Sequence, residues 1–377
     1  MGSVTLGNSI ACNKGAALRS EGGRVPGGSC MLKKNNGLTL FVAMSLLTVS
    51  SALAEKKKDN TESGKRESTA SGTPVLWREP ANIASRNLLY GPGGVEHQPK
   101  SPFTFVKEDL DGTNPKFEVT DADGVKWKVK MGEEARPETV STRLVWAVGY
   151  FANEDYFLPD FRAEQMPHLK RGQNLVGPDG TIHNVRLKRS PKGEKKTGMW
   201  KWRENPFTGT RELNGLRVMM ALINNWDLKD VNNAVYREKH GDDADGGTEV
   251  VYMVTDLGAS FGTTGESWSH AKGKGNIGSY AHSQFIAKVK DDLVDFNGPT
   301  RPAMIVAFNP HEFVSRLNLR WIGKEIPKAD VKWIAGYLAQ LSADQIKDAF
   351  RAAGYTALEV DEFAVLLTDR IAELSKL

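Results

Sequence analysis

Cysteine is nearly absent from this 377-residue sequence, and its two cysteines, Cys12 and Cys30, both precede an apolar segment near the N-terminus. That segment has the features of a removable targeting peptide, so the mature chain is predicted to have no disulfide and no thiol chemistry. Six histidines also lack the spacing of metal ligands: His168, His183, His240, His270, His282 and His311. A disulfide scaffold and a histidine-based metal centre are therefore not expected.

The targeting segment is predicted at residues 31–54. Lys33 and Lys34 form its positive start, residues 38–47 (LTLFVAMSLL) its apolar stretch, and residues 52–54 (ALA) its cleavage pattern. An uncleaved transmembrane helix is the alternative, for which the apolar run is short. We therefore expect a signal peptide, no stable membrane span after its cleavage, and a periplasmic or secreted bacterial protein.

The residues before this segment are Gly-rich and polar, which is unusual ahead of a signal peptide. We therefore expect Met31 to be the true start and residues 1–30 to be a mis-called leader.

An excess of positive charge is also absent from the predicted mature chain. The full sequence has a net charge of +4, but residues 1–54 hold five basic residues and one acidic residue. Their removal leaves 45 basic and 45 acidic residues. This balance gives no support to a nucleic-acid or acidic-lipid partner.

The mature chain is predicted to have a disordered linker at residues 55–75, because that segment is charged and lacks periodicity. Three antiparallel strands follow, at residues 103–108, 117–119 and 125–129, and residues 121–124 (DADG) form the second hairpin turn. A helix with an apolar stripe then runs from Pro137 to Val148, and Gly149 ends it.

The remaining pattern predicts a strand at 181–189, a basic turn at 192–196, a helix at 211–224, and strands at 234–237 and 250–255. Ser342 and Gln345 predict a capping box for a helix over 343–353, and a last helix covers 359–376. Strands come first and helices last, which predicts an α+β protein with a β-rich lobe at 98–200 and a mainly helical lobe at 201–377.

One group of residues is suited to phosphoryl transfer. Residues 227–232 (DLKDVN) follow the 211–224 helix, and residues 256–258 (DLG) end a later strand. Transfer from ATP needs a carboxylate near the attacking hydroxyl, and an amide oxygen and a second carboxylate to hold Mg²⁺.

This pattern resembles the catalytic loop and metal-binding segment of the protein-kinase-like superfamily. The resemblance implies a bilobal kinase-like fold that uses ATP and Mg²⁺. It also implies Asp227 as the catalytic aspartate, Lys229 as the catalytic-loop lysine, and Asn232 and Asp256 as metal ligands. Asn225 stands where the family usually has histidine.

The first lobe carries further elements of the resemblance. Residues 127–130 (WKVK) resemble the strand whose last lysine contacts the phosphates, which implies Lys130, with Glu138 as its ion-pair partner. Lys128 is an alternative because it shares a strand face with Lys130, and Glu134 is an alternative for the acid.

A standard glycine loop is missing between the first two strands. Residues 109–115 (DLDGTNP) occupy that place with one glycine, Gly112, which we expect to contact the nucleotide. In this respect the chain is similar to atypical members such as the HipA toxin kinases, the secreted CotH-like kinases and the phosphatidylinositol kinases. No A-P-E motif is present.

Several of these residues also fit purely structural roles. Asp227 and Asn232 could only stabilise turns, and Lys130 with Glu138 could be a weak surface ion pair. Residues 243–247 (DADGG) hint at a calcium loop but lack its full pattern, which favours a solvated hairpin. Residues 258–278 could be a lid or a plain surface loop.

The sequence therefore predicts an exported ATP- and Mg²⁺-dependent phosphotransferase acting on an unidentified hydroxyl-bearing acceptor. The alternative is a catalytically inactive kinase-fold protein that binds or supports components of the cell envelope, because ATP is scarce outside the cytoplasm. A nucleotidyl or glycan-directed transfer on the same fold is a third hypothesis. The sequence indicates no oligomeric state.

Overall fold

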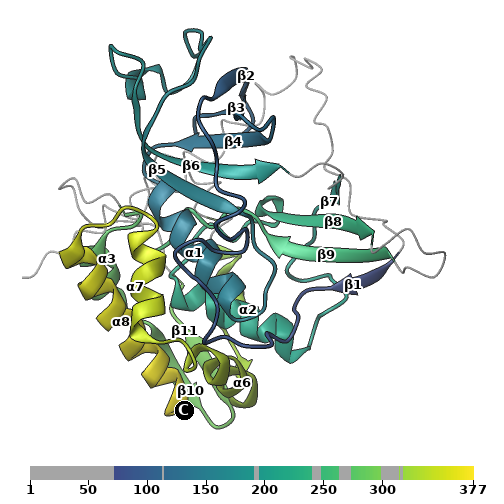
Figure 1. Ribbon diagram of the computed structural model, residues 1–377. Coiled ribbons are helices and arrows are strands. Elements are labelled where there is room, and N and C mark those ends of the chain that lie inside the picture. Colours follow the sequence, from purple (N-terminus) through teal and green to yellow (C-terminus); the bar gives the residue numbers. More distant parts are fainter. Residues whose placement is uncertain are drawn as a thin grey trace, which may run out of the picture. The chain divides into compact units, whose positions relative to one another are not determined.

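The computed structural model describes residues 72–112, 114–190, 195–239, 248–262, 273–298, 314 and 317–377 (Figure 1). The predicted leader, signal peptide, most of the linker and the acidic loop at 243–247 lie outside these residues. The described residues form the expected α+β fold, with a β-rich N-terminal lobe and a mainly helical C-terminal lobe.

The β-rich lobe is built on a five-stranded sheet in the order β2-β3-β4-β6-β5, with every neighbouring pair antiparallel. Its strands are β2 (Thr104–Asp109), β3 (Lys116–Thr120), β4 (Lys126–Met131), β5 (Asp155–Phe161) and β6 (Ile182–Ser190). The three predicted strands and the turn at 121–124 are confirmed. Asp121 stabilises that turn, because its carboxylate accepts hydrogen bonds from the backbone of Asp123 and Val125.

The two faces of this sheet differ sharply, as strand alternation requires. One face is apolar and forms a core around Phe117, Val119, Trp127 and Val129. The opposite face carries charged side chains, which brings Lys130 of β4 directly across from Arg186 of β6.

Helix α1 (Ala135–Ala147) links β4 to β5 and confirms the helix predicted after the third strand. Gly149 lies just past its end with φ +100°, a conformation that favours glycine. An added Cβ there would also collide with the backbone oxygen of Arg78.

A second sheet has the order β1-β9-β8-β7 and consists of β1 (Thr73–Val75), β9 (Thr248–Val254), β8 (Asn233–Lys239) and β7 (Lys195–Gly198). Helix α2 (Arg211–Leu222) lies between β7 and β8 in the chain, and Thr210 accepts a hydrogen bond from the backbone of Leu213 at 3.2 Å. The predicted helix at 211–224 and the two strands that flank the acidic loop are confirmed.

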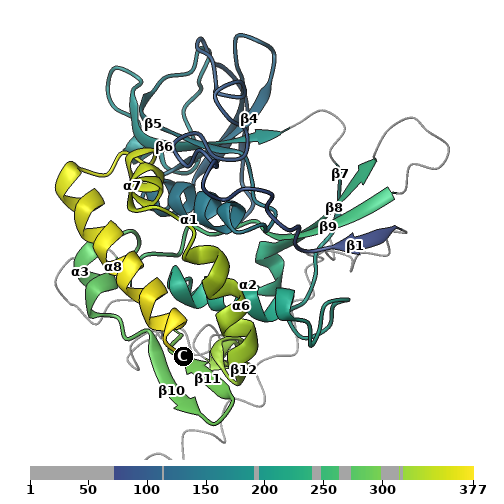
Figure 2. The same ribbon diagram turned by 60° about the horizontal axis from the view of Figure 1, so that its bottom comes forward.

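The C-terminal part adds a small sheet of β10 (Ile286–Lys290), β11 (Leu293–Phe296) and β12 (Ile326–Pro327). The helices in the described residues of this part are α3 (Ile277–His282), α6 (Lys328–Leu338), α7 (Ala343–Arg351) and α8 (Ala357–Ser375) (Figure 2). Short 3₁₀ turns occur at Gln173–Leu175, Asp230–Asn232 and Arg320–Gly323. The predicted capping box of Ser342 and Gln345 is present.

Two sequence expectations are wrong in detail. The sequence predicts that residues 73–75 belong to a disordered linker, but they form β1, which pairs in parallel with β9. Residues 195 and 196 were assigned to a basic turn but open β7, which pairs with β8 rather than folding back on β6. In both cases a distant strand supplies the pairing, so no local signal marks the segment.

Helix α1 is attached to the C-terminal helices as well as to the sheet. Its apolar residues Val140 and Leu144 join the large core that also holds Phe350 of α7 and Phe363 of α8. Arg136 reinforces this attachment, and α1 lies beside α7 in Figure 1.

Arg136 makes several contacts with the turn between α7 and α8. Its guanidinium donates to the carboxylate of Glu359 at 3.0 Å and to the carbonyl of Gly354 at 3.0 Å. It also lies 3.8 Å from the ring centre of Tyr355. The start of α1 is thereby held to the C-terminal helices.

No helix in the described ranges combines the length and the apolar character that a bilayer span requires.

Replacing Arg136 with Ala should lower the free energy of unfolding by about 1–2 kcal/mol, because a cation–π contact and several hydrogen bonds are lost together. The control is Arg351→Ala, which removes an exposed pair with Asp348 in the same helical hairpin and should cost at most about 0.5 kcal/mol. Urea unfolding measures both. Equal effects would contradict the anchoring role of Arg136.

Candidate active site

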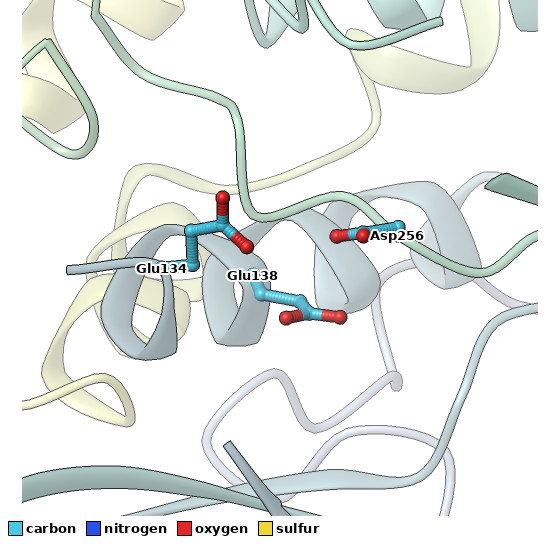
Figure 3. A group of neighbouring side chains, drawn as sticks. All are labelled: Glu134, Glu138 and Asp256. Atoms are coloured by element: carbon cyan, nitrogen blue, oxygen red, sulfur yellow. The ribbon is translucent and has the colours of Figure 1, made fainter. Parts of the chain in front are cut away.

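The ammonium group of Lys130 is surrounded by three carboxylates. Its Nζ lies 2.7 Å from Glu138, 3.0 Å from Glu134 and 3.0 Å from Asp256. The side chain comes from β4, the glutamates from the start of α1, and Asp256 from the loop after β9. Figure 3 shows the three carboxylates, whose oxygens lie within 4.8 Å of one another.

Burial makes these contacts strong. Lys130 is 6% exposed and Glu138 is fully buried, which excludes the alternative of a weak surface ion pair. Burial alone would lower the pKa of Lys130, but Glu138, followed by Asp256 and Glu134, raises that pKa above its usual range. Lys130 is therefore firmly protonated.

The same contacts favour the ionised forms of Asp256 and Glu134. Burial would raise the pKa of Asp256, but Lys130 outweighs this effect and lowers it below its ordinary value. The pKa of Glu134 is also lowered, because Lys130 and Lys274 outweigh the cost of its burial. The group therefore holds permanent charges of both signs in a largely buried place.

Glu138 binds a second cation, Arg186 of β6. The guanidinium of Arg186 lies 2.9 Å from Glu138 and 3.6 Å from Asp155 of β5. Burial raises the pKa of Asp155 to about 6, although Arg186 lowers it in part. Two strands and one helix are thus tied together through a single glutamate.

The structure separates the two lysines that the sequence left as alternatives. Lys128 forms an ion pair with Asp109 at 2.6 Å, whereas Lys130 reaches Glu138 and Asp256. Lys130 is therefore the lysine at the predicted acidic site. Glu134, the weaker alternative acid, accompanies Glu138 rather than replacing it.

Asp227 lies in a loop that begins where α2 ends. Asn224 ends the helix with φ +54°, a left-handed conformation that asparagine tolerates. The backbone of Asp227 donates to the side chain of Asn225 at 2.9 Å, so the asparagine in place of histidine supports the loop. The carboxylate of Asp227 lies 3.3 Å from the ammonium of Lys229, and both side chains are half-buried.

Backbone pairing holds this loop against the segment that contains Asp256. Trp226 donates to the carbonyl of Ala259 at 3.2 Å, and Phe261 donates to that of Ile223 at 2.8 Å. The carbonyl of Asn232 accepts from both the backbone and the hydroxyl of Thr255, at 2.9 and 3.0 Å. Asn232 therefore sits across from the residue that precedes Asp256.

The side chain of Asn232 is held within its own loop by a hydrogen bond. Its side-chain amide nitrogen donates to the carbonyl of Asp227 at 2.7 Å, which is also the turn-stabilising role considered for it. This leaves the amide oxygen to face another partner. Oxygen from an amide and a carboxylate is what Mg²⁺ prefers, so Asn232 and Asp256 fit a magnesium ion.

Gly112 lies in the turn between β2 and β3 with φ +68°. Its carbonyl accepts from the guanidinium of Arg171, which also binds the carbonyl of Asp109 at 2.8 Å. Within the described residues no contact joins Gly112 to the Lys130 group. Its predicted contact with a nucleotide stays a prediction.

Three residues at this site were missed by the sequence analysis. Arg186 contacts Glu138, while Asn114 and Lys274 contact Glu134 at 2.5 and 2.6 Å. Alternation in residues 181–189 puts Arg186 on the face opposite Val185, but only the pairing of β6 with β4 brings it to Glu138. Lys274 belongs to the segment that was considered a lid, of which residues 263–272 lie outside the described residues.

Gly258 should be required for the close approach of the Asp256 segment to α1. An added Cβ would lie 2.6 Å from the Cβ of Glu134, so Gly258→Ala should cost about 1–3 kcal/mol of stability. The control is Gly336→Ala in α6, where an added Cβ meets nothing within 4 Å and should stabilise the helix by about 0.5–1 kcal/mol. If urea unfolding finds Gly258→Ala as stable as the unaltered chain, this packing is wrong.

Comparison with known proteins does not identify a family for this chain. No protein-family model and no curated protein matches the chain. Among solved structures, the chain is similar to the crystal structure of a Helicobacter pylori proinflammatory kinase, CtkA, with 11% sequence identity and a TM-score of 0.39. The similarity covers 72% of this chain and 95% of that one. This likeness is too distant to assign an activity to the chain.

Proposed function

We propose that the protein is an exported phosphotransferase that moves the terminal phosphoryl group of ATP, with Mg²⁺, to a hydroxyl-bearing acceptor. The observation that carries this proposal is the buried contact of Lys130 with both Glu138 and Asp256. A fixed cation beside a carboxylate is what a phosphate chain and its metal require. Export and the acceptor belong to the proposal and depend on the sequence alone.

Asp227 and Lys229 act on the acceptor and on the transferred phosphoryl group. Asp227 orients the acceptor hydroxyl and takes its proton as the acceptor oxygen bonds to the terminal phosphorus. The bond from that phosphorus to the bridging oxygen breaks, and its electron pair leaves with the diphosphate. Lys229, held 3.3 Å from Asp227, offsets the negative charge of the moving group.

The other residues bind and position the donor. Lys130 faces the phosphates, and Glu138 keeps it aimed because Glu138 is itself fixed by Arg186. Asn232 and Asp256 would hold Mg²⁺, which neutralises phosphate charge when bound. The hydrogen bond from Asn232 to the carbonyl of Asp227 supports this assignment, because it keeps Asn232 close to the proposed catalytic residue.

Replacing Asp227 with Asn should lower the rate of phosphoryl transfer by about 10²–10⁴, because the proton acceptor is lost while the loop is kept. Transfer is measured with ATP labelled on its terminal phosphate, scored on the protein itself and on water. The control is Asp230→Asn in the same loop. Asp230 accepts from the backbone of Trp202 at 3.1 Å, a contact that Asn can keep, so its rate should stay within about twofold.

Full activity in Asp227→Asn would overturn the proposed role of this residue. An inactive unaltered chain is tested further by its melting temperature with and without Mg²⁺ and ATP. Saturation at 100 times Kd stabilises a protein by about 2.7 kcal/mol. No transfer and no shift would favour the non-enzymatic envelope protein, whereas a shift without transfer would indicate a nucleotide-binding module.

A further inference from the structure

Lysines occupy every position of β4 from Lys126 to Lys130 that lies on the charged face of the five-stranded sheet. On β4 this face presents Lys126, Lys128 and Lys130, and the facing positions of β3 and β6 are also polar. Together these positions are Lys116, Glu118, Thr120, Lys126, Lys128, Lys130, Arg186, Lys188 and Ser190. Only Lys130 and Arg186 of this set belong to the Lys130 group described above.

Like charges lie directly opposite one another on this face. Lys128 pairs in register with Lys188, and Lys116 pairs with Lys130. Side chains in such positions have Cβ atoms about 4.5–5.5 Å apart, and like charges there are destabilising. An anion between them removes that penalty.

Acidic partners within the protein do not fully balance these lysines. Lys128 and Lys116 share one carboxylate, that of Asp109, at 2.6 and 3.8 Å. Lys188 is half-buried and makes neither a hydrogen bond nor an ion pair with any of the described residues. Three lysines thus border this part of the face with one ion-pair partner among them.

Asp155 does not fill the role of counter-ion for Lys188. It stands opposite Lys188 in the register of β5 and β6, but its carboxylate is aimed at Arg186, 3.6 Å away. The backbone carbonyl of Asp155 accepts from Arg143, which fixes the residue in this orientation.

The same face offers little to a flat nucleobase, which binds best between apolar or aromatic surfaces. The apolar side chain of Phe157, on β5, lies on this face across from Arg186. It packs against Gly354 in the turn between α7 and α8, where the main chain covers it. The face is suited to charge rather than to a ring.

We propose that Lys128 and Lys188, with Lys116 beside them, bind an anionic group of the phosphoryl donor, which is therefore held by its phosphoanhydride chain along β4. This inference rests on the proposed function and specifies its donor by chemical class. The chain can belong to a nucleoside triphosphate or to inorganic polyphosphate, and the experiment separates the two.

The spacing of the lysines agrees with such a ligand. Lys128 and Lys130 are two residues apart on one strand, or about 7 Å, so a linear chain of phosphates can meet both. The protonation of Lys188 can respond to a bound anion. Burial and then Arg186 lower its pKa to about 8, and Asp155 acts in the opposite direction. Lys128 also lowers that pKa and Glu138 raises it. A bound anion would favour the protonated form.

The test is isothermal titration calorimetry on the full chain with inorganic tripolyphosphate, ATP and adenosine as ligands. The unaltered chain should bind tripolyphosphate and ATP with affinities within about tenfold of each other and adenosine not measurably. Lys188→Met and Lys128→Met should each weaken tripolyphosphate binding by about tenfold. Lys188→Arg, which keeps the positive charge, should retain the binding of the unaltered chain. The matched control is Lys126→Met, an exposed lysine on the same face of the same strand, which should bind as the unaltered chain does.

Circular dichroism and melting temperature identify any variant that fails to fold, for which Lys188→Gln is the substitute. Unchanged tripolyphosphate binding in folded Lys128 and Lys188 variants would overturn the inference, and so would tight binding of adenosine. Labelled phosphoryl transfer by the same variants keeps the two proposals apart. If the Lys128 and Lys188 variants bind tripolyphosphate more weakly as expected but the unaltered chain transfers no phosphoryl group, the anion site is supported and the proposed function is overturned. Transfer that is insensitive to Lys128 and Lys188 but lost in Asp227→Asn does the reverse.

Discussion

A buried lysine ammonium among three carboxylates, two from the start of α1 and one from the loop after β9, is the interaction on which this site depends. Burying a charge is costly unless it is paired, so Lys130 constrains β4, the start of α1 and the loop after β9 to meet. Glu138 extends the constraint to β6 through Arg186. In the proposed function, a bound phosphate chain would meet charges that are already fixed, so that transfer would need little reorganisation.

The first turn of α1 is held on two sides, by the sheet and by the C-terminal helices. Glu138 faces the sheet, while Arg136 faces the turn between α7 and α8. The position of the ion pair therefore depends on packing in the C-terminal helices. Stability of the helical part and geometry of the charged site are physically linked.

Much of this arrangement could be predicted from sequence because its signals are local. Alternation in residues 117–129 fixed the face of Lys130, the helix after it placed Glu138 one turn in, and the DLKDVN and DLG segments stood at element ends. The expectation for Asn232 and Asp256 gained support from the contacts of Asn232 with Asp227 and Thr255. Their metal-binding role, and the role of Gly112, remain predictions.

What the sequence could not supply is pairing between distant segments. Nothing local indicates that β6 pairs with β4 rather than with β7, so neither the contact of Arg186 nor the juxtaposition of Lys128 and Lys188 was foreseen. β1 has only three residues and owes its strand form to β9. Lys274 lies in a Gly-rich segment without periodicity, and only its position in the fold brings it to Glu134.

Chemical labelling tests most directly whether the charged face of the sheet holds a phosphate chain beside Lys130. Acyl phosphates of ATP transfer their acyl group to lysines at a phosphate site, which makes them a direct probe. The account predicts acylation of Lys188 first, because its lowered pKa leaves more free amine, with Lys128 and Lys130 behind it. Excess ATP or tripolyphosphate should protect all three, as mapped by peptide mass spectrometry. Acylation confined to exposed lysines such as Lys126, with no protection by either anion, would contradict the account.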